Sequence, residues 1–472
     1  MKLPGLESIT KLGLPVLAAV AVGLLVVFLS WADGALIKLV FGWGQGVLIP
    51  SSPGSEALNA VPGWHVAGFA PVRVALFLMV ALAALGIGLG ALIDTNRFSL
   101  HAMYRARLIR AYLGASRPTG ERNPDPFTGF DEQDNLHMSQ VSRDPPLHIV
   151  NLALNLVRGR NLAWQERKAE SFTVTPLHAG SGNVGYRRTW LRDCPDPNAV
   201  DPRYYGGPNG ISLGTAVTIS GAAASPNMGY HSSASITFLM TLFNARLGWW
   251  LGNPGPAGEL GRIMKHGPVF NRRTPSNSIV PIWNEMFGKT NDESKWVYLS
   301  DGGHFENLGL YEAVARRCRF VLVSDASCDE TCSLADLGNA LRKIRIDFGI
   351  PVEFDKFDVT SRAKATADSR YWALARIRYS VVDGTGQGSD GLLIYVKPGF
   401  YGSEPRDIYN YAQVSPAFPH ESTSDQFFSE TQFESYRSLG AYTAEKLIRE
   451  LRIAEYYDAE RGWQAEPIRR PP

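Results

Sequence analysis

The chain has 472 residues, which is enough for one large domain or two smaller ones. Its 47 Lys and Arg residues nearly balance its 45 Asp and Glu residues, so a formal net charge of +2 does not favour a nucleic-acid-binding protein. Four cysteines are too few for a disulfide framework.

Two long apolar stretches near the start predict a membrane hairpin. Residues 12–32 carry no charge, and residues 72–93 carry only Arg73 near one end. Each stretch is long enough to cross a bilayer as a helix, and both are apolar on every face, which disfavours a pair of buried core helices. Lysines precede the first stretch and several arginines follow the second, so the positive-inside rule places both termini in the cytoplasm. The sequence therefore predicts a multi-pass membrane protein with two spans within residues 1–113.

The next part of the chain predicts a polar connection and then the start of an α/β region. Residues 114–146 are rich in Pro, Asp, Asn and Gly, which indicates a linker or a long surface loop. Residues 147–157 and 171–177 are apolar or β-rich and predict strands. Small residues over 212–226 predict a helix. Residues 233–250 predict an apolar helix, either in the core or facing a membrane.

A strand–helix–strand pattern then indicates a parallel sheet. Residues 296–300 and 320–326 are apolar strands, and between them Leu310, Val314 and Cys318 lie four apart on one helical face. Parallel strands joined by a helix form a βαβ unit. We therefore expect an α/β fold over residues 147–350, with a partly parallel sheet and flanking helices.

The segments that follow predict further regular structure. Apolar residues over 334–348 predict a helix capped by Ser333 and ended by Gly349. Residues 351–472 predict an extension of the same domain. This extension contains a β-hairpin around the Gly-rich turn at 384–391 and a helix that begins with a capping box at Ser429 and Gln432.

The cysteines raise the question of a metal site. Cys328 and Cys332 lie four residues apart, and Cys318 and His304 precede them. This spacing fits no standard zinc pattern, so the sequence favours isolated thiols over a zinc site. We therefore expect no metal.

An acidic corner follows the strand at 296–300. Asp301 is followed by Gly302 and Gly303, which allow a sharp turn and leave room beside the carboxylate. At the carboxyl end of a parallel strand, this is a position where ligands bind. Two readings remain open at this point: a catalytic carboxylate, or a turn in which Asp301 acts as a local hydrogen-bonding cap.

The segment "DGGHFENLGL" (301–310) resembles the DGG box of patatin-like phospholipases and the Asp box of cytosolic phospholipases. "ISGAAASP" (219–226) resembles the Ser-Ala-Ala-Pro segment of patatins, and "SFTVTPLHAGS" (171–181) is similar to the Phe-Thr-Pro strand of the cytosolic enzymes. The resemblance implies a lipid acyl hydrolase with a Ser–Asp dyad and no cofactor. It makes Asp301 the general base and lets Gly302 and Gly303 shape access for the substrate.

The nucleophile of such an enzyme is not evident. The sequence has no Gly-rich oxyanion loop of the family kind, and its one Gly-x-Ser-x-Gly match, "GISLG", contains Ser212. A serine elbow needs an entering strand, which the preceding residues do not predict, so Ser212 is either a nucleophile or a helix N-cap. We expect Ser220 to pack in the core and His304 to have a structural or rim role.

Two functions therefore remain open. The first is a membrane-anchored acyl hydrolase acting on a membrane lipid, or the C-terminal portion of one, with its serine supplied by an upstream subunit. The second is a non-catalytic membrane-tethered scaffold or binding protein that kept the fold.

Overall fold

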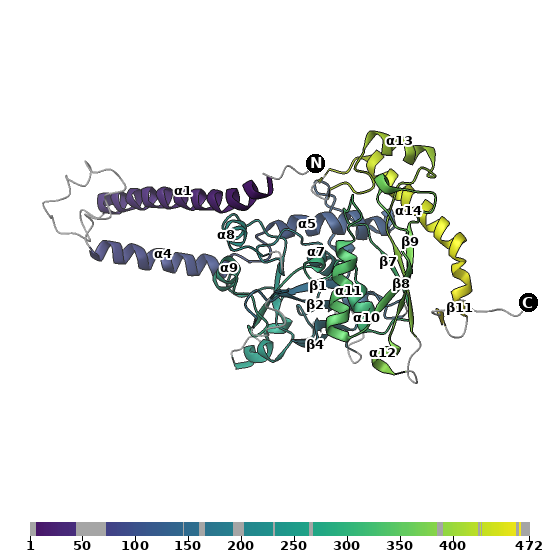
Figure 1. The fold of residues 1–472 in the computed structure, drawn as a ribbon. Helices are drawn as coiled ribbons and strands as arrows, with labels where there is room; N and C mark the ends of the chain where they lie inside the picture. The colour runs from purple at the N-terminus through teal and green to yellow at the C-terminus, as the bar shows by residue number, and fades with distance from the viewer. Residues whose placement is uncertain are drawn as a thin grey trace, which may run out of the picture. The chain divides into compact units, whose positions relative to one another are not determined.

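The computed structural model describes residues 6–43, 72–144, 146–159, 166–191, 203–229, 232–263, 268–384, 390–422, 425, 427–458 and 462–463. The chain divides into two compact units, Met1–Phe305 and Glu306–Pro472. Figure 1 shows the elements of both.

The first unit is built on a six-stranded antiparallel sheet. Its strands are β1 (Val150–Asn155), β2 (Ala169–Val174), β3 (His178–Ser181), β4 (Gly185–Arg188), β5 (Trp249–Gly252) and β6 (Trp296–Asp301). They lie in the order β4-β3-β2-β1-β6-β5, and every neighbouring pair is antiparallel. The side chains of alternate residues on β1 and β6, such as Leu152 and Leu299, form the buried core of this unit.

The first unit also contains six α-helices among its described residues. They are α1 (Leu6–Trp43), α4 (Val72–Leu92), α5 (Leu100–Leu108), α7 (Leu213–Ser220), α8 (Ala234–Leu242) and α9 (Ile279–Met286). α7 covers the core face, because its Ala216 and Ile219 are fully buried in the same cluster as Leu152 and Leu299.

The second unit contains a separate mixed sheet. Its strands are β7 (Phe320–Ser324), β8 (Val352–Lys356), β9 (Trp372–Ile377) and β10 (Gly391–Val396), in the order β7-β10-β9-β8. Only β10 and β7 are parallel; the other two pairs are antiparallel. Its helices are α10 (Leu310–Ala315), α11 (Ala335–Phe348), α12 (Ser380–Asp383), α13 (Arg406–Val414) and α14 (Glu430–Leu451), and a short pair, β11 (Tyr457–Asp458) and β12 (Gly462–Trp463), follows.

The predicted βαβ unit and its parallel sheet are wrong. β6 and β7, the two strands assigned to that unit, belong to different sheets, and β6 is antiparallel to both of its neighbours. The connecting helix α10 has six residues, whereas a parallel crossover usually needs a dozen or more. The apolar run of β7 was also misleading, because Val321 and Val323 are buried whereas Leu322 is 54% exposed.

The predicted two-span hairpin is also contradicted. A membrane span needs about 20 consecutive apolar residues. Among the residues that the structure describes, no helix is long and apolar enough for this. This finding overturns the multi-pass membrane localisation that rested on the hairpin.

Several local predictions are confirmed. The capping box at the start of α14 joins Ser429 and Gln432, and β9 pairs with β10 as an antiparallel hairpin. Two details are wrong. Leu334, not Ser333, precedes α11 as its cap, and the helix predicted over 233–250 ends at Leu242. Asn244 then adopts a positive φ of 53° that few side chains tolerate in a helix, and the chain continues into β5.

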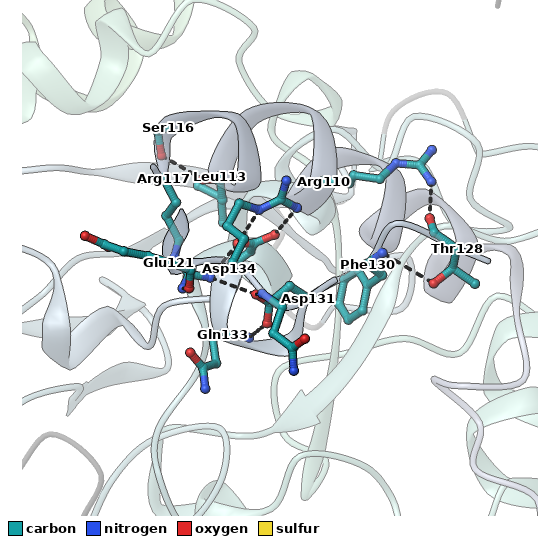
Figure 2. Close-up of polar contacts among 12 residues, drawn as sticks. Arg110, Leu113, Ser116, Arg117, Glu121, Thr128, Phe130, Asp131, Gln133 and Asp134 are labelled. Atoms are coloured by element: carbon teal, nitrogen blue, oxygen red, sulfur yellow. Dashed lines mark hydrogen bonds and ion pairs between the residues drawn. The ribbon is translucent and has the colours of Figure 1, made fainter. Parts of the chain in front are cut away.

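The segment expected as a linker is held by a carboxylate cluster (Figure 2). Asp134, 1% exposed, accepts bonds from Arg117 at 2.6 Å and from Arg122 at 2.8 Å. Asp131 caps the short 3₁₀ turn Glu132–Asp134 by accepting a bond from the amide of Gln133. These bonds hold residues 117–134 together, and the segment belongs to the first unit.

Candidate functional site

Asp301 stands at the end of β6, where the sheet is paired on one side only. Its backbone lies opposite Leu152 of β1. On the other side, the pairing with β5 ends two residues earlier, where Trp249 lies opposite Leu299. Asp301 therefore extends past the end of β5 at the margin of the sheet. Because side chains alternate along a strand, it points to the same face as Leu299, which is the face that α7 covers.

The carboxylate is held by its own turn and is largely desolvated. Its Oδ1 atom accepts a hydrogen bond of 2.7 Å from the amide of Gly303. In the described part of the chain, Oδ2 has no hydrogen-bond partner. Burial raises the pKa of Asp301 from its usual 3.8 to about 6, and the bond from Gly303 opposes this rise only in part.

The C-terminal end of α7 approaches this corner. The Ser220 hydroxyl donates to the carbonyl oxygen of Asn151 at 2.8 Å. The same oxygen lies only 2.7 Å from the position that a Cβ atom of Gly302 would occupy. Glycine is therefore required at 302 by the close approach of β1, and Ser220 and the DGG turn meet at one backbone carbonyl.

A tyrosine of α5 completes the neighbourhood. Burial, and after it the charge of Asp301, raise the pKa of Tyr104. The Tyr104 hydroxyl lies 2.6 Å from where a Cβ atom of Gly221 would be, directly after α7. The Tyr104 hydroxyl is therefore protonated at neutral pH, and its pKa is influenced by the charge of Asp301.

His304 is part of the structural support of the corner. Its Nδ1 is 2.7 Å from the hydroxyl of Ser300, and its Nε2 is 3.2 Å from the carbonyl oxygen of Ala223. Asn155 also donates to Ser300 at 2.8 Å. His304 thus ties the DGG turn to the segment after α7.

Ser212 lies at the opposite end of α7 from this corner. It is 7% exposed and is the N-cap of α7, accepting a bond from the amide of Thr215 at 3.2 Å. A helical rise of 1.5 Å per residue separates Ser212 from Ser220 by roughly 12 Å along the axis. In the described residues 203–211, no strand leads into Ser212, so the strand–turn–helix geometry of a serine elbow is not formed.

Sequence reasoning anticipated the Asp-Gly-Gly corner but not its neighbours. Tyr104 lies almost 200 residues before Asp301, and nothing in its local pattern points to a site. Ser220 sits in the small-residue helix, whose composition indicated close backbone contact without showing which backbone.

The structure places no metal centre near these residues. Among the described residues, no three His, Cys, Asp or Glu side chains are grouped so that they could hold an ion. Cys318, Cys328 and Cys332 are free thiols.

Comparison of the chain with protein-family models, curated proteins and solved structures found no match.

Proposed function

We propose that the chain contributes the aspartate base of a serine–aspartate hydrolase that cleaves an acyl ester of a lipid. The observation that supports this most directly is the state of Asp301. Its carboxylate lies past the last residue paired with β5, one of its oxygens is without a hydrogen bond among the described residues, and its pKa is about 6. A base of this pKa is ionised at neutral pH and still basic enough to accept a proton.

The chemical role of Asp301 follows from this state. As a serine hydroxyl attacks the ester carbonyl, its proton passes to Asp301, and the acyl-enzyme forms when that proton is returned to the departing alcohol. Water then repeats the sequence and releases the fatty acid. No metal or cofactor takes part in these steps.

The serine of the dyad has two possible sources. Ser220 is the described serine of α7 that lies at the same end as Asp301, but its hydroxyl is already bonded to Asn151. Ser212 is buried as an N-cap at the far end. We therefore propose that the nucleophile is supplied by an upstream polypeptide, and treat Ser220 as the in-chain alternative.

The test is fluorophosphonate labelling together with hydrolysis of a fatty-acyl ester. Both are measured on the chain alone and on the chain co-expressed with the polypeptide encoded upstream. We expect the upstream polypeptide to be labelled, and the pH profile of hydrolysis to rise with a midpoint near 6. The Asp301→Asn variant should lose at least 100-fold in turnover, the usual contribution of a general base.

Three comparisons make the result decisive. Asp125→Asn, which changes an exposed carboxylate in a turn, should retain full turnover. Labelling of this chain that disappears in Ser220→Ala, but not in Ser212→Ala, would assign the nucleophile to Ser220. If Asp301→Asn hydrolyses the ester at the normal rate, Asp301 is not the general base and the proposal is wrong. If neither preparation hydrolyses the ester, the proposal is likewise wrong.

A further inference from the structure

A polar cavity of about 310 Å³ lies at the N-terminal end of α7, within the first unit. This volume is at the lower end of the range for small-molecule sites. The residues that define its chemistry come from four separate segments of the chain: Arg97, Arg105, Ser212, Thr215, Trp249 and Arg273.

Three arginines, Arg97, Arg105 and Arg273, line the cavity. Arg105 is half-buried, and its Nε donates to the Thr215 hydroxyl at 3.0 Å, which fixes the guanidinium and leaves its outer N–H groups available. Arg273 donates to the side-chain oxygen of Asn209 at 3.3 Å. Within the described part of the chain, neither these two nor Arg97 forms an ion pair.

The two carboxylates in the cavity wall, Asp94 and Glu132, offset these cations only in part. Asp94 stabilises the turn after α4, because its Oδ1 accepts hydrogen bonds from two backbone amides and from the Thr274 hydroxyl. Glu132 is exposed. Three cations against two carboxylates leave an excess of one positive charge. Burial lowers the pKa of Arg105, the charges of Arg273 and Arg97 lower it further, and the charge of Glu132 opposes this change in part.

Two polar atoms of the wall are buried with nothing to bind. Among the described residues, Trp249 Nε1 and His137 Nδ1 have no hydrogen-bond partner. Buried polar groups are nearly always paired, so each unpaired atom calls for an explanation. Both residues line this cavity, although the two unpaired atoms are themselves not exposed to it.

The N-terminal end of α7 adds a positive electrostatic potential, but two of its backbone amides are already hydrogen-bonded. The amide of Gly214 is bonded to Asn135, and the amide of Thr215 to Ser212. An anion would therefore gain from the positive end of the helix dipole, while its hydrogen bonds would come from the arginines.

We propose that this cavity binds a small phosphate-bearing molecule. Guanidinium groups bind phosphate through paired N–H groups, and several of them are needed to offset its double charge. The volume exceeds that of the phosphate group, and the apolar side chains of Trp249 and Leu251 provide a wall for a short organic part. This site is at the other end of α7 from Asp301, so the inference does not depend on catalysis there.

The experiment measures binding of three probes to the full chain by titration calorimetry. They are inorganic phosphate, glycerol 3-phosphate, and vesicles containing phosphatidic acid. We expect saturable binding that weakens by at least about 10-fold in Arg105→Met and in Arg273→Met, since each variant removes charge-assisted hydrogen bonds to the phosphate. Arg110→Met, which removes an exposed arginine bonded to the Thr128 carbonyl, should bind normally. Tighter binding of glycerol 3-phosphate than of vesicles would indicate a free metabolite as the source, and the reverse a lipid headgroup.

A second readout covers the case in which an arginine variant fails to fold. Because Trp249 lines the cavity, ligand should change its fluorescence, and Trp249→Phe should remove that change. Absence of saturable binding for all three probes would overturn the proposal. Binding that is equal in the normal chain, both cavity variants and Arg110→Met, with no Trp249 signal, would likewise assign it to the general surface and overturn it.

Discussion

Replacing Asp301 with asparagine should make the first unit more stable at neutral pH. The turn at 301–303 needs an acceptor for the Gly303 amide, and an asparagine side-chain oxygen can accept that 2.7 Å bond. The negative charge, by contrast, is unfavourable where it stands, because burial raises the pKa of Asp301 to about 6. Asparagine keeps the turn and removes the buried charge.

The size and pH dependence of the gain follow from the two pKa values. A rise from 3.8 to about 6 corresponds to about 3 kcal/mol, since each pH unit is worth 1.36 kcal/mol. Partial exposure of the side chain reduces this to about 1–3 kcal/mol. The folded state binds the proton more tightly than the unfolded chain does. The normal protein therefore keeps its full stability below pH 3.8 and loses this contribution as the pH rises through about 6. The advantage of Asp301→Asn should accordingly be absent below pH 3.8 and complete above pH 7.

Urea unfolding at half-unit steps between pH 4 and pH 8, followed by tryptophan fluorescence, measures this gain. Asp125→Asn is the matched control, because hydrogen bonds from Thr128 lower the pKa of Asp125, so its loss cannot stabilise the protein as the pH rises. An Asp301→Asn variant that is no more stable than the normal protein at pH 7 would refute the desolvation argument. A gain of equal size at pH 4 and pH 8 would do the same, because it could not come from ionisation.

Two further predictions concern buried charges in the same unit. Arg246→Met should lower the free energy of unfolding in urea by about 3–5 kcal/mol, because it leaves the fully buried Glu285, 2.8 Å from Arg246, without its ion-pair partner. The double variant with Glu285→Gln should recover part of this loss, and a loss below about 1 kcal/mol in the single variant would contradict the prediction. Asp134→Asn should destabilise the protein at pH 7, because bonds from Arg122 and Arg117 lower the pKa of Asp134 and the ionised carboxylate stabilises the fold. This contribution is lost as the pH falls, so the difference in stability between the variant and the normal protein should vanish on acidification; a difference that persists at pH 3 would show that the charge is not involved.

Local signals in the sequence predicted local structure well. The capping residues Ser429 and Gln432 predict the start of α14, and the Gly-rich turn at 384–391 predicts the β9–β10 hairpin. Both features depend on contacts between residues that are close in the sequence. Strand partners depend on the whole chain. The residues of β6 and β7 read as neighbours in a parallel sheet, yet each pairs with strands far away in sequence. The same limit applies to the candidate site: Asp301 is evident from its own turn, whereas Tyr104 is brought to it by the packing of α5.

The two readings of the Asp-Gly-Gly corner can be separated by asking what the carboxylate does that an amide could not. As a cap, Asp301 uses one oxygen and needs no charge, so the cap reading predicts that asparagine is equivalent or better. Nothing in the described structure pairs with the charge: no cation bonds to Asp301, and the nearby Tyr104 hydroxyl is neutral. A charge that weakens the fold without serving the turn is typical of a functional group, because activity often depends on locally unfavourable positions. If Asp301→Asn is both more stable and inactive, the carboxylate has a catalytic role. If the variant is more stable and fully active, Asp301 acts only as a hydrogen-bonding cap of the turn.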